Sequence, residues 1–149
     1  MSLRIYLACP FPRAFDLARP MMKKLRDAGH TITCDWTEGL GEDPSHVRKA
    51  ETELSREEQA KYARADLEGV RTADLVWALA TDLGGTGMWW ECGYMQALID
   101  HDPRRSPMHP TRALVVSGPP RTIFTSLSAR TFVTHDEALA YILTLKAIP

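Results

Sequence analysis

Short apolar runs alternate with longer amphipathic segments along this chain. An apolar run of a few residues that ends at a turn signal is typical of a strand buried on both faces of a parallel sheet. Five segments are predicted as strands: residues 4–9, 31–36, 73–80, 113–116 and 130–133. Apolar spacing and helix-forming composition predict helices between them, over residues 15–28, 47–72 and 88–99, with a last helix after residue 134.

Short-range signals predict several helix boundaries. Gly29 follows the first helix and is the residue type that most readily adopts the left-handed cap conformation. Ser45 can cap the second helix, which is long enough to consist of two pieces. Thr134, with Glu137 three residues later, matches the capping box that starts the last helix.

The alternation of strands and helices predicts the fold class. All 149 residues fit one α/β domain, with about five parallel strands and helices on both faces in three layers. In such sheets ligands bind beyond the carboxyl ends of the strands. The loops that we expect to matter for function are residues 10–13, 36–44, 81–90 and 117–124.

Composition narrows the function classes. The net charge of -1 lacks the basic footprint of a protein that binds a nucleic-acid polymer, so any nucleotide partner is expected to be a small metabolite. We find no signal peptide and no apolar run that approaches a membrane span. The three cysteines, Cys9, Cys34 and Cys92, are too few and unevenly placed for a disulfide framework or a metal site. We expect a cytoplasmic protein with no metal and no cofactor, and with Cys9 and Cys34 as core residues.

The segment from Gly84 to Tyr94 carries the strongest chemical signal. Its glycines follow a predicted strand and open a helix, so backbone amides can approach a polar or anionic ligand closely. The spacing matches neither the dinucleotide-binding GxGxxG motif nor a P-loop. Glu91 lies in the first turns of this helix, where an acid can simply stabilise the helix dipole by about 0.3–1 kcal/mol. Its apolar neighbours, and Gly93 within the helix, make a functional carboxylate an equal alternative.

Other candidates carry weaker signals. Asp66 falls within an apolar helix face, where it needs a partner or a function, although a solvated stripe edge explains it too. Asp74 is interpreted as a satisfied structural carboxylate. Tyr6 lies in mid-strand, and its hydroxyl requires a hydrogen-bond partner if it is buried. Three tryptophans fall in the loops expected to face a ligand: Trp36, Trp89 and Trp90. Either packing in the core or stacking on a base explains this cluster.

Three blocks of sequence resemble the nucleoside 2-deoxyribosyltransferase family, including its nucleoside 5′-monophosphate N-glycosidase relatives. Residues 5–11 (IYLACPF) resemble the family's opening strand, usually I-Y-L-A-G-P-F. Residues 65–74 (ADLEGVRTAD) resemble its D-x-x-x-I-x-x-x-D block, and residues 85–94 (GTGMWWECGY) its G-x-G-x-x-x-E-x-G block. Their order and spacing agree through about residue 97.

The resemblance implies a flavodoxin-like or Rossmann-like fold and an enzyme of the transferase or hydrolase class. It implies cleavage or exchange of the N-glycosidic bond of a (deoxy)nucleoside or nucleoside 5′-monophosphate. Glu91 matches the nucleophile that carries a covalent glycosyl intermediate, Asp66 the acid near the base, and Tyr6 the residue that orients the nucleophile. The expected substrate-binding residues are Cys9, Pro10, Phe11, Trp36, Gly85, Thr86, Gly87, Met88 and Trp89.

The resemblance also implies a homodimer or larger assembly, because sites in this family borrow residues from a neighbouring subunit. The positional candidates for that contribution are Thr122, Thr125, Ser126 and Ser128. Two positions depart from the family pattern. Cys9 replaces a glycine, and Gly85 stands where transferases often have Asp and nucleotide hydrolases often have Ser. Three alternatives remain open: an NAD- or ADP-ribose-type glycohydrolase, a non-catalytic nucleotide-binding or sensing module, and a scaffold without a ligand.

Overall fold

Five parallel strands form one sheet in the order β2-β1-β3-β4-β5. The computed structural model describes residues 2–38, 40, 54–103, 111–119 and 122–145. The strands are β1 Arg4–Ala8, β2 Thr31–Ile32, β3 Leu75–Leu79, β4 Ala113–Ser117 and β5 Arg130–Phe132. All five predicted strands are therefore present, and every pair is parallel as expected.

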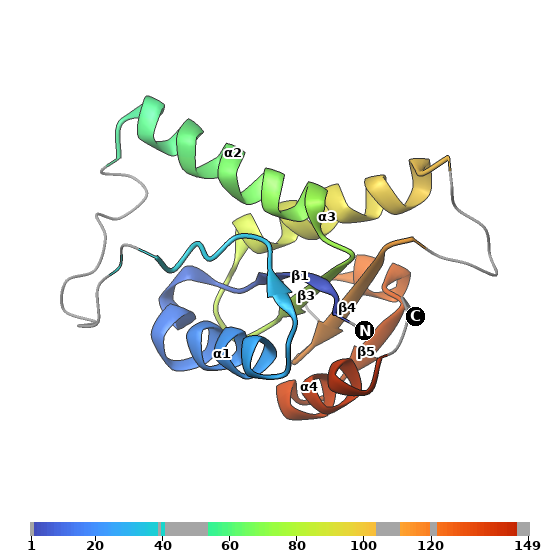
Figure 1. Ribbon diagram of the computed structural model, residues 1–149. Coiled ribbons are helices and arrows are strands. Elements are labelled where there is room, and N and C mark those ends of the chain that lie inside the picture. The colour runs from blue at the N-terminus through green and yellow to red at the C-terminus, as the bar shows by residue number, and fades with distance from the viewer. Residues whose placement is uncertain (1, 39, 41–53, 104–110, 120–121, 146–149) are drawn as a thin grey trace.

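Helices cover both faces of the sheet (Figure 1). On one face lie α1, Arg19–Asp27, and α4, His135–Thr144, and on the other lie α2, Arg56–Thr72, and α3, Thr86–His101. This arrangement confirms the predicted three-layer α/β class. None of the helices that the structure describes is long and apolar enough to cross a membrane.

Alternate residues of the central strands supply two separate cores. In β3, Leu75, Trp77 and Leu79 pack toward α1 and α4, whereas Val76 and Ala78 pack toward α2 and α3. All five are fully buried. This two-sided burial follows from the period of two along a strand and explains the continuous apolar run that predicted it.

Local sequence signals set the ends of two helices as predicted. Gly29 has φ +88° and comes directly after Ala28, the C-cap of α1. Thr134 accepts a hydrogen bond from the backbone of Glu137, and the Glu137 side chain accepts one from the Thr134 N–H, which completes the capping box of α4. Such motifs involve neighbours only, so they are readable without the rest of the fold.

The first helix and the second strand differ from the prediction. Residues Ala14–Ala18 form a wide π-helical turn, and the regular α-helix begins at Arg19. Pro20 has no N–H to donate to the carbonyl four residues earlier, which accounts for the interruption. Strand β2 ends after Ile32 instead of residue 36, because the chain turns at Asp35, whose side chain accepts a hydrogen bond from the Thr37 N–H.

Within the predicted helix 47–72, α2 begins at Arg56 after the non-helical residues 54 and 55, and residues 47–53 lie outside the described residues. Ser55 has extended backbone and forms a capping box with Glu58, which stops the helix from extending further toward the N-terminus. The predicted cap, Ser45, lies outside the described residues. The first turns of α2 extend past the sheet (Figure 1). Its expected core-facing stripe is largely exposed: Tyr62 is 40% and Leu67 36% accessible.

The strand order places a topological switch point between β1 and β3. From β1 the chain proceeds outward to β2, and from β3 it proceeds in the opposite direction to β4 and β5. The loops that follow β1 and β3 therefore separate at the carboxyl edge of the sheet. The second of these loops leads into α3, the helix that carries Glu91.

Candidate active site

The centre of the candidate site is a hydrogen bond between β1 and α3. The Tyr6 hydroxyl donates to Oε1 of Glu91 over 2.8 Å, and it joins residues 85 positions apart in the chain. Tyr6 is fully buried in the middle of β1, whereas Glu91 is half-buried near the start of α3. The phenol therefore reaches from the core to one oxygen of the carboxyl group and fixes its orientation.

The electrostatic setting of Tyr6 keeps its phenol neutral. Burial raises the pKa of Tyr6 far above its usual value, and the nearby carboxyl groups of Glu91 and Asp66 raise it further. A neutral phenol is a hydrogen-bond donor, as the geometry requires.

Asp66 reaches the same region from α2. The Cys34 thiol, just beyond β2, donates a hydrogen bond to Oδ1 of Asp66 over 3.7 Å. The charge of Asp66 contributes to the raised pKa of Tyr6, so the two acids share one electrostatic neighbourhood. The structure thus brings together Tyr6, Glu91 and Asp66, as expected. The side of α2 on which Asp66 was expected to lie is not a buried apolar face, because Tyr62 and Leu67 on either side of it are exposed.

Gly69 allows α2 to lie close to β1. A Cβ at this position would lie 2.5 Å from the Cβ of Cys34 and 2.8 Å from Cδ2 of Tyr6, distances that side chains do not tolerate. Asp66 and Gly69 are three residues apart and so share one side of the helix. The close approach at Gly69 therefore delivers Asp66 to the Tyr6–Glu91 pair.

The start of α3 explains the departure at Gly85. This residue is the N-cap of α3 and has φ +75°, a conformation that residues with a side chain rarely adopt. A Cβ there would also lie 3.0 Å from Cγ of Pro10. Thr86 and Gly87 follow on the exposed surface, and the amides of this first turn have no capping side chain from Gly85. At position 85 this turn can offer backbone atoms but no side chain to a ligand.

The remaining predicted binding residues fall into two groups. Cys9 and Met88 are core side chains, 8% and 3% exposed, and Cys9 packs on the α1 side, away from Tyr6. Phe11 and Trp36 are half-buried with ring centroids 6.3 Å apart, and the Trp36 indole donates to the Leu7 carbonyl over 2.8 Å. These two rings form an aromatic edge next to the carboxyl end of β1.

Asp74 has the structural role that its position predicts. It accepts hydrogen bonds from the Arg4 backbone N–H at 2.8 Å and from the Arg4 guanidinium at 2.6 Å. Burial alone would raise the pKa of Asp74, but the hydrogen bonds and charge of Arg4 lower it overall. This pair ties the start of β1 to the start of β3. Within the described ranges, no cluster of three or more His, Cys, Asp or Glu side chains has the arrangement of a metal site.

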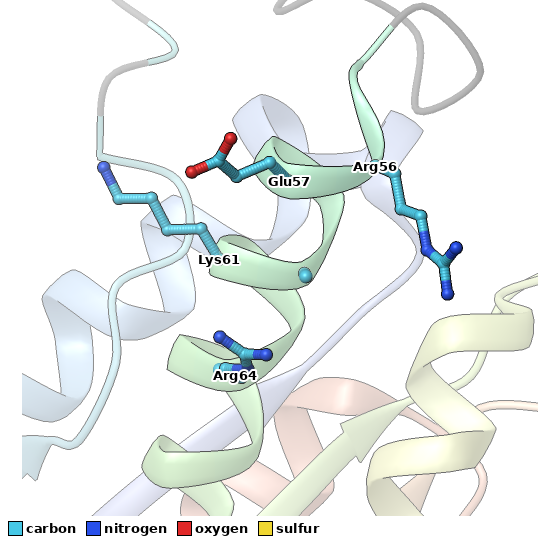
Figure 2. A pocket seen from close by; sticks show the side chains of 5 residues that line it. Arg56, Glu57, Lys61 and Arg64 are labelled. Atoms are coloured by element: carbon cyan, nitrogen blue, oxygen red, sulfur yellow. The ribbon is translucent and has the colours of Figure 1, made fainter.

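Two hollows lie near the helices of the α2/α3 face. The first is lined by one half-buried and four exposed residues of α2: Ala60, Arg56, Glu57, Lys61 and Arg64. Figure 2 shows Glu57 and Lys61 extending to the same side of the helix while Arg56 points elsewhere. None of the three residues at the centre of the site lines this hollow. It is a charged helix surface without convergent chemistry.

The second hollow is an apolar groove of about 700 Å³ on the outer side of α2 and α3, and Tyr6, Asp66 and Glu91 do not line it. Its lining combines the predicted residues Thr86 and Trp89 with side chains from α2, α3 and the turn after β4: Leu67, Trp90, Gly93, Tyr94 and Phe124. Trp90 is 76% and Phe124 68% exposed. Gly93, whose place inside a helix suggested close packing or close approach of a ligand, has no protein atom within 4 Å of where a Cβ would lie. This apolar groove is therefore uncovered in the single chain.

Comparisons with known proteins agree with the arrangement of the three blocks. The family model described as nucleoside 2-deoxyribosyltransferase matches residues 5–100, which include Tyr6, Asp66 and Glu91. The chain belongs to this family. Among solved structures, it is similar to a 2-deoxyribosyltransferase from the psychrotolerant bacterium Bacillus psychrosaccharolyticus, with 21% identity and a TM-score of 0.62. That similarity covers 96% of this chain and 92% of the other. No sequence among the curated proteins matches this chain significantly.

Membership in the nucleoside 2-deoxyribosyltransferase family places the chain among enzymes that act on nucleosides, and the structural neighbour shares its fold. The motif residues were readable from the sequence. The sequence did not indicate the roles of two further residues. Cys34 was predicted as a core residue, but its thiol forms a hydrogen bond with Asp66, and Gly69 allows α2 to lie close to β1. The only local signal for Gly69 was a glycine inside a helix, where it costs about 1 kcal/mol relative to alanine.

Proposed function

We propose that this protein cleaves or exchanges the N-glycosidic bond of a nucleoside or nucleoside 5′-monophosphate, with Glu91 as nucleophile. The observation that carries the proposal is the 2.8 Å hydrogen bond from the Tyr6 hydroxyl to Glu91. It fixes the orientation of the Glu91 carboxyl group. A half-buried acid with a fixed orientation suits attack on an anomeric carbon better than it suits a solvated helix start.

The first step forms a covalent intermediate. One Glu91 oxygen forms a bond to the anomeric carbon while the bond from that carbon to the base nitrogen breaks, and the bonding electron pair leaves with the base. Asp66 gives the departing base a proton or a hydrogen bond. Charge on the sugar develops as in retaining glycosidases, where a nearby carboxylate stabilises the oxocarbenium-like state.

The second step releases the sugar and restores Glu91. Attack by a second base at the anomeric carbon gives exchange, and attack by water, with loss of a proton, gives hydrolysis. The balance between them depends on how well the occupied site excludes water. Phe11 and Trp36 offer an aromatic edge for the base, and the amides of residues 85–88 offer donors for the sugar or a 5′-phosphate. Gly85 supplies no acid or hydroxyl there, which favours recognition of this part of the substrate by backbone N–H groups.

We further propose that a second copy of this chain covers the apolar groove. Leu67, Trp90 and Phe124 are exposed together there, and Gly93 leaves room for close approach. Of the four positional candidates for a contributed hydroxyl, only Ser126 is exposed, and all four form hydrogen bonds within their own turn. Sedimentation over a range of protein concentrations tests the assembly, and a monomer at every concentration contradicts it.

The test of the function is release of free base from a panel of nucleosides, 2′-deoxynucleosides, their 5′-monophosphates and NAD, with and without an added acceptor base. We expect Glu91→Gln to lower turnover by roughly a thousandfold or more, because it removes the nucleophile. Glu57→Gln, an exposed acid on α2, is the matched control. Turnover of Glu91→Gln at the rate of the control would remove Glu91 from the mechanism.

A mechanism-based trap tests the intermediate separately. A 2′-fluoro nucleoside slows breakdown of a glycosyl ester, so mass spectrometry after incubation should find the sugar attached to the peptide that contains Glu91. Tight binding of a nucleotide without turnover or labelling would instead support the sensing alternative. Nicotinamide release as the main activity would support the NAD-type glycohydrolase.

A further inference from the structure

Each acid of the candidate site has its own hydrogen-bond donor from a different element. The Tyr6 hydroxyl on β1 donates to Glu91 over 2.8 Å, and the Cys34 thiol beyond β2 donates to Asp66 over 3.7 Å. Gly69 brings both donors against α2, since a side chain at that position would meet Cys34 and the Tyr6 ring at once. The two pairs are therefore assembled by one close contact.

We propose that Cys34 is a positioning residue, whose thiol orients the Asp66 carboxyl group toward the leaving base. This inference rests on the proposed function for the role of Asp66, although the contact itself does not. Cys34 donates a hydrogen bond to Asp66, just as Tyr6 donates one to Glu91. A simple packing role would require only the volume of the side chain, whereas a positioning role requires the S–H donor.

The surroundings of Cys34 keep that donor protonated. Burial, followed by the charge and hydrogen bond of Asp66, raises the pKa of the Cys34 thiol to about 12. The other titratable groups that act on the thiol are Asp35, its neighbour in the chain, and Glu91 on α3. All three surrounding groups are acids, so the thiol remains a donor at neutral pH. Its reactivity as a thiolate nucleophile is correspondingly low.

Kinetics of three variants separate positioning from packing. We expect Cys34→Ala to lower kcat/KM about fivefold, the weight of a weak hydrogen bond, and to move the pH limb governed by Asp66 to higher pH by about half a unit. The limb moves upward because a carboxylate that loses a donor holds its proton more tightly. Cys34→Ser keeps a donor and should restore both values toward wild type. Cys92→Ala, which removes a buried thiol next to Glu91, should leave the limb in place.

Two results would contradict the positioning role of Cys34. A pH profile of folded Cys34→Ala that coincides with wild type contradicts the proposal, as does Cys34→Ser behaving like Cys34→Ala. If Glu91→Gln retains full turnover, the proposed function fails instead. If Glu91→Gln is inactive and Cys34→Ala is normal, only the positioning role fails.

An infrared measurement tests the contact without any activity. The S–H stretching band lies in a nearly empty part of the spectrum, and a hydrogen bond to a carboxyl group lowers its frequency. We expect one low-frequency band that disappears in Cys34→Ala and moves to higher frequency in Asp66→Ala, while the Cys9 and Cys92 bands remain. If the Cys34 band is unchanged in Asp66→Ala, the thiol does not bond to Asp66 and the proposal is overturned.

Discussion

The two faces of the sheet are built from alternate residues of the same strands, yet their buried polar side chains have different kinds of partner. The α1/α4 face is closed: Trp77 is fully buried there and donates to Ser117, whose hydroxyl bonds His135 on α4. The α2/α3 face has Tyr6 at an equivalent depth, but its hydroxyl bonds the half-buried Glu91. One face thus satisfies its polar atoms within the core, and the other directs the Tyr6 hydroxyl to a half-buried carboxyl group, the proposed nucleophile.

The difference extends to the outer surfaces. The α2/α3 face exposes Leu67, Trp90 and Phe124 around one apolar groove, whereas Leu143 is the one large apolar side chain that the described parts of α1 and α4 expose. Both faces contribute a buried core to stability, but the exposed groove lies on the α2/α3 face alone. Substitutions on the closed face should act on folding, and substitutions at Tyr6, Glu91 and the exposed groove residues on activity and assembly.

A pair of tryptophans gives the largest expected contrast. Trp77→Ala should lower the free energy of unfolding by about 3–5 kcal/mol, because it leaves a cavity in the closed core and removes the partner of Ser117. Trp90→Ala should change the stability of the monomer by less than about 0.5 kcal/mol, since 76% of Trp90 is exposed. Urea unfolding measures both. A large, concentration-dependent loss in Trp90→Ala would locate a subunit interface at the groove.

A pair of tyrosines tests the chemistry of the same two faces. Tyr6→Phe removes the donor to Glu91 and keeps the ring, so we expect kcat/KM to fall by roughly 10- to 100-fold, as for a charge-assisted hydrogen bond of about 1.5–3 kcal/mol. Tyr141→Phe on α4, whose ring packs against Phe132, should leave activity unchanged. Steady-state kinetics on the best substrate decide it. Equal effects of the two changes would mean that the faces are not functionally distinct.

Two helical glycines sharpen the comparison within the α2/α3 face. Gly69→Ala should cost about 1–3 kcal/mol of stability, because the new Cβ would lie 2.5 Å from Cys34 and force α2 outward. Gly93→Ala should stabilise the isolated chain by up to about 1 kcal/mol, since it gains helix propensity and meets nothing within 4 Å. Thermal unfolding measures both. If Gly69→Ala is neutral, the close approach of α2 is not required.

The sequence predicted those features that depend on neighbours along the chain. The apolar run of β3 identified a strand buried on both faces, and Thr134 with Glu137 identified the start of α4. Motif spacing led to Tyr6, Asp66 and Glu91, which the fold brings together. These signals are local or are carried by a resemblance, so they require no knowledge of packing.

The features that the sequence did not predict arise from long-range packing. Periodicity marks the side of α2 that carries Tyr62 and Leu67 as apolar, but it cannot say whether that side meets the sheet, and both residues are exposed. The contact between Cys34 and Asp66 joins residues 32 positions apart and requires the close approach at Gly69. No pattern within one segment encodes such a contact.

The smallest expected effect concerns the pH dependence of the closed face. His30 is 8% exposed, and its Nδ1 accepts a hydrogen bond from the Leu3 N–H over 3.2 Å, so the ring must stay neutral to accept. Burial lowers the pKa of His30, and burial together with the charge of Arg13 lowers that of His135. Because both pKa values are lower in the folded state, the stability they contribute is complete above about pH 6.5 and is lost as the pH falls toward the folded-state values.

Asparagine substitutions isolate this contribution. His30→Asn keeps an acceptor near the position of Nδ1 and removes the titration, so its free energy of unfolding should decline less than wild type between pH 7.5 and pH 5. Each histidine should account for no more than about 1 kcal/mol, the net weight of one hydrogen bond. The double variant with His135→Asn should show the smallest slope in urea titrations across that range. A wild-type curve that rises as the pH falls would show that one of these rings binds its proton more tightly in the folded state, and the closed face would then contain a charged group.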